Sequence, residues 1–168
     1  MNRALYLCAA LCTAAGTLLH FAFDRLGRPR WLAPLLAVNE SVWEHTKLLT
    51  VPVLGLVPLQ SRLLGLPPEM LMGPNLAALG AGVSAMVLLY YFWVGGIGKN
   101  SLWLGVGLFF TSAAVCYGTL AFLLGSGGAP WPWEPVLGAL VLVYTVFTYA
   151  PPRLPLFRDG PTGRYGLE

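Results

Sequence analysis

Charged residues are scarce in this sequence, at 10% of its 168 positions, whereas hydrophobic residues make up 57%. An ordinary soluble domain carries about 25% charged residues. The scarcity excludes a conventional soluble domain, because one small core cannot hide this much apolar surface. The net charge is only +3, and no basic helix with interleaved aromatic residues indicates a nucleic-acid partner.

Sequence motifs with a known chemistry are also missing. The chain has no Walker loop, GxGxxG, HExxH, CxxC or GxSxG, which excludes the nucleotide-binding, zinc-protease, thiol-redox and hydrolase sites that these motifs build. Its three cysteines, Cys8, Cys12 and Cys116, all lie in apolar runs and are expected to be free and buried. The only two histidines are His20 and His45, which limits the imidazole ligands available to a metal.

Long apolar runs are what the sequence has in abundance. A helix needs about 20 apolar residues to cross the hydrocarbon core of a bilayer, with a range of about 17–25. The chain is therefore predicted to be all-α, a polytopic helical bundle that forms a single integral-membrane domain over residues 1–168. The five expected transmembrane helices, followed by a tail over 151–168, are 4–23, 41–60, 75–95, 102–125 and 134–150.

The placement of basic residues predicts the orientation of this bundle. With five spans, Arg3 and Arg62 fall on one side of the membrane and seven basic residues fall on the other. Cytoplasmic loops carry the excess of Lys and Arg, so the N-terminus is expected outside and the C-terminus in the cytoplasm. The residues on the majority side are Arg25, Arg28, Arg30, Lys99, Arg153, Arg158 and Arg164.

A polar run interrupts the apolar pattern at residues 39–47. Ser41 and Glu44 have the spacing of a capping box and predict the start of the second helix. The last turn of the first helix and the first turns of the second should lie at one depth, near the cytoplasmic face. Placing an ionisable group at such a depth costs free energy, and the groups found there are often functional. The candidate ligand or proton centre consists of His20, Asp24, Asn39, Glu40, Glu44, His45 and Lys47.

Three interpretations of this centre remain open. In the first, Glu44 caps the helix, Lys47 forms a salt bridge with it, and the other groups are solvated at the interface. In the second, His20, His45 and Glu44, with Glu40 or Asp24 as a further ligand, hold zinc or iron. Glu44 and His45 are adjacent, so their side chains diverge by about 100° on a regular helix, and this geometry makes it unfavourable for both to bind the same ion. In the third, the centre handles a proton or a substrate: two close, partly desolvated carboxylates cannot both be ionised without a free-energy cost, so one pKa should rise and the pair could act as an acid/base couple or as a proton-coupled binding site.

The C-terminal tail could belong to the same centre. Arg158, Asp159 and Arg164 emerge on the predicted cytoplasmic side, beside Glu40 and Glu44. One of the two arginines could neutralise a carboxylate, and the tail could fold over the centre as a lid. In the alternative, the tail is a solvated terminus that meets anionic lipid headgroups.

Two segments resemble a known family. The run Val38–Leu48 (VNESVWEHTKL) is similar to the signature of small bacterial multi-pass membrane proteins that are described only as a domain of unknown function. The residues Pro151–Asp159 (PPRLPLFRD) and Thr162–Gly166 (TGRYG) resemble the ending of the same family. The resemblance implies a protein of the bacterial cytoplasmic (inner) membrane, and it implies no activity.

Two classes of function are compatible with these features. The first is a non-enzymatic carrier or accessory subunit without a cofactor, whose polar centre binds an ion, a proton or a lipid headgroup. The second is an intramembrane enzyme that acts on a lipid, with Glu44 or Glu40 as general base and His45 or His20 as acid or as ligand to zinc or iron. Whether the protein is an enzyme stays open. Its expected partners are the lipid bilayer and either a second copy of the chain or another membrane subunit.

Overall fold

The computed structural model describes residues 2–98, 101–127 and 132–167, and within these ranges the chain is helical without a β-strand. An isolated β-bridge joins Arg158 to Tyr165 in the tail. The elements in chain order are α1 (Asn2–Arg25), the 3-10 helix η1 (Arg30–Leu32), α2 (Val42–Gly55), α3 (Val57–Leu64), α4 (Pro68–Ile97), α5 (Leu102–Gly125), α6 (Glu134–Tyr149) and the 3-10 helix η2 (Pro155–Phe157). Lys99, one of the basic residues expected on the cytoplasmic side, lies outside the described residues, as does Trp131.

The second predicted span consists of two helices with a bend between them. α2 begins at Val42, one residue after its N-cap Ser41, as the sequence predicts. α2 and α3 meet at an angle of 41° around Leu56. Pro58, in the first turn of α3, has no N–H to continue the hydrogen-bond ladder of α2. Pro52 lies inside α2, and the break comes after it, at Leu56.

α4 is longer than predicted and begins at Pro68 rather than near Asn75. Proline suits the first helical position, because its φ is already helical and its missing N–H would have no partner there. Pro74 lies inside α4 and does not end it. At the far end, Gly98 closes the helix with φ 71°, a conformation that glycine adopts without steric cost.

Two glycines allow the central helices to approach closely. A Cβ on Gly82 of α4 would lie 2.8 Å from the Cβ of Cys116 in α5. A Cβ on Gly16 of α1 would lie 2.4 Å from the backbone oxygen of Leu48 in α2 and 2.5 Å from the ring of Phe109 in α5. Small residues serve this purpose in membrane helices, where backbones pack by van der Waals contact.

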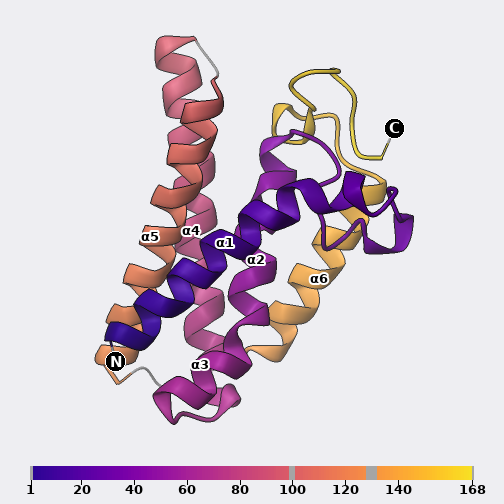
Figure 1. Cartoon of the computed structure of the whole chain (residues 1–168). Coiled ribbons are helices and arrows are strands. Elements are labelled where there is room, and N and C mark those ends of the chain that lie inside the picture. The colour runs from indigo at the N-terminus through magenta and orange to yellow at the C-terminus, as the bar shows by residue number, and fades with distance from the viewer. Residues whose placement is uncertain (1, 99–100, 128–131, 168) are drawn as a thin grey trace.

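Figure 1 shows the resulting arrangement. α4 and α5 run side by side as a hairpin, α1 lies against α2 and α5, and α6 lies on the other side of α2. The N-terminus and the C-terminal tail lie at opposite ends of the bundle. The main core is formed between α1, α2, α4 and α5, and it buries the three cysteines, which are free as expected.

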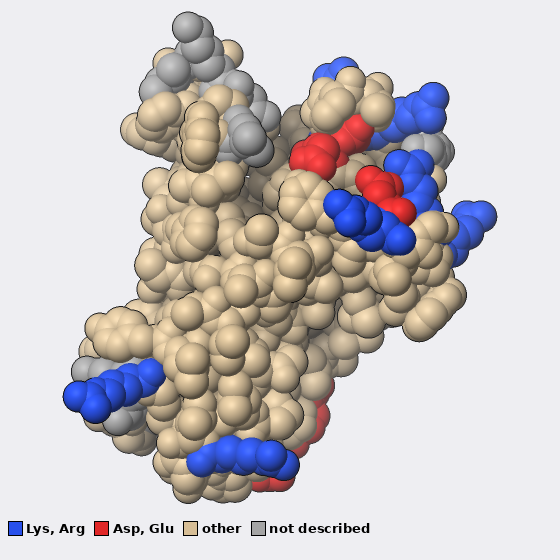
Figure 2. Space-filling view, viewed as in Figure 1, with Lys and Arg blue, Asp and Glu red and all other residues tan. Residues whose placement is uncertain are grey.

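The helices are consistent with a membrane protein, but they do not establish five spans. Three of them, α1, α4 and α5, are long and apolar enough to cross a bilayer, and the bent pair α2–α3 could act as a fourth span. α6 has 16 residues and falls below the length required. In the space-filling view of Figure 2, Lys, Arg, Asp and Glu gather at the two ends and leave an uncharged band between them.

Candidate functional site

The start of α2 orients the polar run of the sequence. The Ser41 hydroxyl caps the helix by accepting a hydrogen bond from the backbone N–H of Glu44 at 3.3 Å. Glu44 and His45 then follow one another in the first turn, about 100° apart around the axis. The Glu44 side chain therefore lies on the buried side of α2, and the His45 side chain lies on the side that faces α1. One helical turn thus contributes to two separate polar centres.

The first centre contains His20, Glu40 and His45, which we call the His–Glu–His centre. His20 is in the last turns of α1, Glu40 is in the loop before α2, and His45 is in α2. Glu40 lies between the imidazoles, with one oxygen 3.6 Å from Nε2 of His20 and the other 3.5 Å from Nε2 of His45. One potential ligand atom from each residue lies within 4.8 Å of the others. The side chains are 25%, 51% and 31% exposed, so solutes can reach the centre.

A hydrogen bond fixes the tautomer of neutral His45. Its Nδ1 lies 2.8 Å from the backbone oxygen of Ser41, which can only accept, so Nδ1 carries the proton. The other nitrogen, Nε2, then presents a lone pair toward Glu40. A metal-binding histidine is typically oriented in this way, by donating its other ring N–H to a backbone carbonyl or a carboxylate.

His20 is constrained differently. Its ring stacks edge-on against Phe21 and lies 5.3 Å from the ring of His45, measured between centroids. Its Nδ1 is buried, and among the described residues it has no hydrogen-bond partner. His20 therefore has no counterpart of the Ser41 backbone oxygen that accepts from Nδ1 of His45.

The distances in this centre are too long for direct hydrogen bonds, and because they involve different oxygens of Glu40 and ligand atoms spread over up to 4.8 Å, the three side chains would draw closer together around a single metal ion. Hydrogen bonds between nitrogen and oxygen span about 2.7–3.2 Å, shorter than both Glu40–imidazole distances. Zinc binds nitrogen and oxygen at about 2.0–2.2 Å, which in a tetrahedral site places neighbouring ligand atoms roughly 3.3–3.5 Å apart. A lone pair of His45 opposite a carboxylate oxygen also calls for a cation or a proton between them.

The second centre is the buried pair of Glu44 and Lys47. Their relative exposures are 1% and 0%, and Nζ of Lys47 lies 2.6 Å from a carboxylate oxygen of Glu44. The same oxygen accepts from the backbone N–H of Val38 at 3.0 Å. The Lys47 ammonium donates to Ala33 O, Leu36 O, Glu44 Oε2 and Thr148 Oγ1, at 2.6–3.2 Å. Lys47 therefore ties the segment after η1 and the end of α6 to α2.

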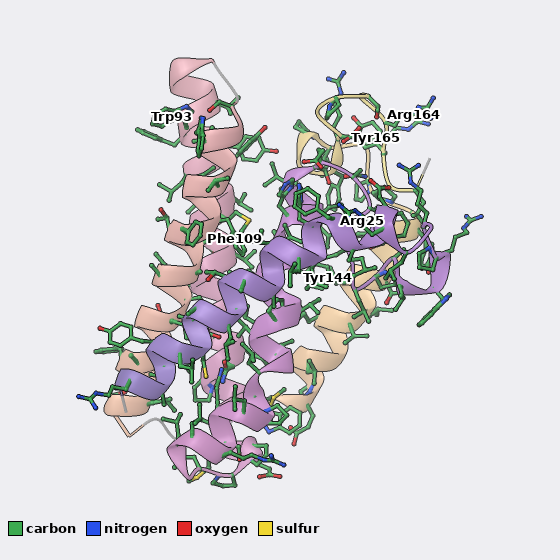
Figure 3. The ribbon with its side chains drawn as sticks, viewed as in Figure 1. Arg25, Trp93, Phe109, Tyr144, Arg164 and Tyr165 are labelled. Carbon is green, nitrogen blue, oxygen red and sulfur yellow. The ribbon has the colours of Figure 1, made fainter. Side chains whose placement is uncertain are left out.

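A polar seam continues from this pair between α2 and α6. The Tyr144 hydroxyl lies 2.8 Å from Oγ1 of Thr46 and 2.9 Å from Oγ1 of Thr50. Figure 3 labels Tyr144 on α6, beside α2. Thr148, one turn after Tyr144, is fully buried and donates to the Tyr144 backbone oxygen at 2.7 Å while accepting from Lys47. Tyr144 and Thr148 were not among the predicted site residues, although their i, i+4 spacing in an apolar helix was an available signal.

Asp24 and Asn39 lie outside both centres. Asp24 forms an exposed ion pair with Arg28 at 2.7 Å. Asn39 accepts from the backbone N–H of Ser41 and donates to the backbone oxygen of Gly166 in the tail, both at 2.9 Å.

The tail folds back onto the start of α2. Phe157 is buried against Trp43 and Phe147, with ring centroids 5.0 and 5.2 Å apart. Asp159, 6% exposed, accepts from the backbone N–H of Glu40 at 2.8 Å. Burial raises the pKa of the Asp159 carboxyl, but hydrogen bonds from Thr162 and from the Glu40 backbone outweigh burial and hold that pKa below its ordinary value.

The two tail arginines do not neutralise a carboxylate of the centre in the part of the chain that the structure describes. Arg158 and Arg164 are exposed, and neither forms an ion pair with any residue in the described ranges. Figure 3 places Arg164 and Tyr165 in the tail, at the same end of the bundle as Arg25 of α1. The Arg158 guanidinium instead lies over Gly163, where an added Cβ would be 3.2 Å from Nη2.

Residues 1–167 match the model of a family described as a family of unknown function, DUF6512. The chain belongs to this family. Comparisons with curated proteins and with solved structures gave no match. The description of DUF6512 names no ligand or reaction, so the chemistry of the two centres rests on their side chains.

Proposed function

We propose that this protein is a multi-pass membrane protein whose His–Glu–His centre binds a divalent transition metal, zinc or iron. The observation that carries the proposal is the spacing of Glu40 between the two imidazoles, at 3.5 and 3.6 Å. Two imidazoles and one carboxylate are the ligand set of many catalytic zinc sites and of open iron sites. Three protein ligands leave a coordination position for water or for a bound solute.

The buried pair supports the choice of Glu40 over Glu44 as the carboxylate ligand. The oxygen of Glu44 that contacts Lys47 also accepts a backbone hydrogen bond, and the side chain is almost fully buried. Glu40 is half exposed, and its side chain approaches both imidazoles.

Metal analysis of the protein purified in detergent tests this proposal. We expect close to one zinc or iron per chain, and its loss in His20→Ala, His45→Ala and Glu40→Gln. Asp24→Asn is the matched control, because Asp24 lies one turn after His20 but pairs with Arg28. A wild-type protein without stoichiometric metal would refute the metal centre and would favour a proton shared between Glu40 and the imidazoles.

The open coordination position also favours a second candidate, a metal-dependent enzyme that acts on a lipid at the membrane interface. Bound metal would lower the pKa of a coordinated water and supply a nucleophile. Turnover of phospholipid in vesicles that contain the protein, abolished by His45→Ala and retained by Asp24→Asn, would establish an enzyme. A metal-loaded protein that leaves every lipid class intact would favour a carrier or accessory subunit.

We further propose that the bundle lies in a bacterial inner membrane with the His–Glu–His centre on the cytoplasmic side. The basic residues support this orientation, because Arg3 near the start of α1 and Arg62 in α3 belong to the end opposite the tail, and most of the other described basic residues belong to the end that carries the tail. A reporter fused after Glu168 should be active in the cytoplasm. Activity of that fusion only in the periplasm would reverse the orientation.

A further inference from the structure

We propose that the C-terminal tail is a clasp that holds Glu40 at the His–Glu–His centre, with Asp159 as its positioning residue. The inference rests on the proposed metal site and identifies what orders its carboxylate ligand. Asp159 Oδ1 accepts the backbone N–H of Glu40 at 2.8 Å, across 119 positions of sequence. The preceding residue, Asn39, is held by the tail as well, through its hydrogen bond to the backbone oxygen of Gly166.

The tail is rigid enough to act as a clasp. Oδ2 of Asp159 accepts from both the backbone N–H and the hydroxyl of Thr162. The backbone of Asp159 donates to the oxygen of Arg164 and accepts from the N–H of Gly163, each at 2.9 Å. Gly163 has φ 71°, which permits the tight turn between these bonds. The carboxylate that reaches Glu40 is therefore fixed from its other side by its own turn.

Anchors on both sides connect this turn to the bundle. Before it, Phe157 is buried against Trp43 of α2. After it, Gly166 packs so closely that a Cβ there would lie 2.9 Å from the backbone oxygen of Thr148 in α6. Gly166 has φ 64°, so this close approach and the backbone conformation both require glycine. Asp159 is thus held at a fixed position relative to α2.

Glu40 needs an external support of this kind. It precedes the N-cap of α2, so the hydrogen bonds of the helix do not hold its backbone. Its side chain is half exposed and, within the described ranges, contacts only the two imidazoles as polar partners. A ligand that is already positioned binds metal without first being ordered, which is why outer-shell partners typically change metal affinity 10–100-fold.

Zinc binding and the visible absorption of bound Co²⁺ test the clasp in the full-length protein. We expect Asp159→Ala to weaken zinc binding about tenfold. At saturating Co²⁺, its spectrum should shift toward that of Glu40→Gln, because the first change loosens the carboxylate ligand that the second change removes. Asp159→Asn keeps an oxygen that can accept from Glu40, so its affinity should lie closer to that of the wild type. Arg164→Ala is the control, because it removes a tail charge and keeps the backbone bond to Asp159.

The outcomes separate the clasp from the metal site itself. A wild-type protein that binds neither Zn²⁺ nor Co²⁺ overturns both proposals. A wild-type protein that binds metal, with Asp159→Ala unchanged in affinity and spectrum, overturns the clasp alone. Equal weakening by Asp159→Ala and Arg164→Ala also overturns it, because the effect would then come from a general disturbance of the tail and not from loss of the bond between Asp159 and Glu40. If Asp159→Ala does not fold, Thr162→Val should weaken binding in the same direction by a smaller factor, and unchanged binding in that variant refutes the clasp.

Discussion

Removing the charge of Lys47 is the most direct test of how the polar residues at the start of α2 are held. Lys47→Met keeps an unbranched side chain of similar length and leaves the Glu44 carboxylate buried without its cation. That carboxylate would retain the backbone N–H of Val38 as a hydrogen-bond donor. The ties from Lys47 to Ala33, Leu36 and Thr148 would be lost at the same time.

The structure sets the expected size of the effect. Breaking a buried ion pair by removing one partner costs about 3–5 kcal/mol, and both side chains here are almost fully buried. Glu44→Gln should cost less, about 1–3 kcal/mol, because a neutral amide oxygen can still accept from Lys47 and three other acceptors remain. The double variant should cost less than the sum of the two single changes, because each single change leaves one buried charge without its partner and the double variant leaves none.

The free energy of unfolding, from titration of detergent micelles with a denaturing detergent, measures these differences. Arg28→Met is the matched control, because Arg28 forms an ion pair with Asp24 in which both side chains are 71% exposed. Exposed pairs contribute about 0–1 kcal/mol. If Lys47→Met destabilises the protein no more than Arg28→Met does, the pair does not anchor α2, and the reasoning fails.

Three further perturbations test other parts of the structure. Gly16→Ala should lower the free energy of unfolding by about 1–3 kcal/mol through overpacking. Gly80→Ala should not destabilise the protein, because no atom lies within 4 Å of the added Cβ. Equal stabilities of the two variants would contradict the close approach of α1 to its neighbours. Gln60 and Asn75 form a reciprocal buried amide pair, so Asn75→Ala should cost about 1–3 kcal/mol in unfolding titrations, and Gln60→Leu/Asn75→Leu should cost less. The lowered pKa of Asp159 means that its contribution to tail anchoring is complete above its unfolded pKa of about 3.9 and is lost as pH falls through the lower folded value. The protection of the tail amides from hydrogen exchange, relative to the intrinsic exchange rate at each pH, should therefore fall only in acid. A loss of this protection near neutral pH would contradict the assignment.

Local sequence signals predicted the helices well, because the start and the end of a helix depend mainly on residues that are neighbours in the sequence. The N-cap at Ser41 follows from its capping side chain, whereas the position of the bend at Leu56, just before Pro58, was not predicted. The early start of α4 was not predicted, because Pro74 reads as a helix boundary, although Pro68 is better suited to that role. The fifth span was predicted from hydropathy alone, and α6 is too short to establish it.

The candidate site depends on contacts that no local pattern encodes. The divergence of Glu44 and His45 around α2 follows from helix geometry, so their separation into two centres was foreseeable. The choice of Glu40 as neighbour of both imidazoles depends on a loop conformation that Asp159 fixes from across the sequence. The contact between Lys47 and Thr148 depends on the register of α6 against α2, which hydrophobic patterning leaves undetermined.

The two polar centres lie on different sides of one helical turn, one fully buried and the other partly exposed. The buried side, through Lys47, connects α2 to the segment after η1 and to α6, and its groups have little exposure to solvent. On the other side, His45 lies near His20 and Glu40. These three side chains are partly exposed, and Nδ1 of His20 has no hydrogen-bond partner among the described residues. A binding site needs accessible and unsatisfied ligands, and such ligands cannot hold themselves in place. The buried pair and the tail supply that support from two directions, so disruption of either should loosen the centre without removing a ligand from it.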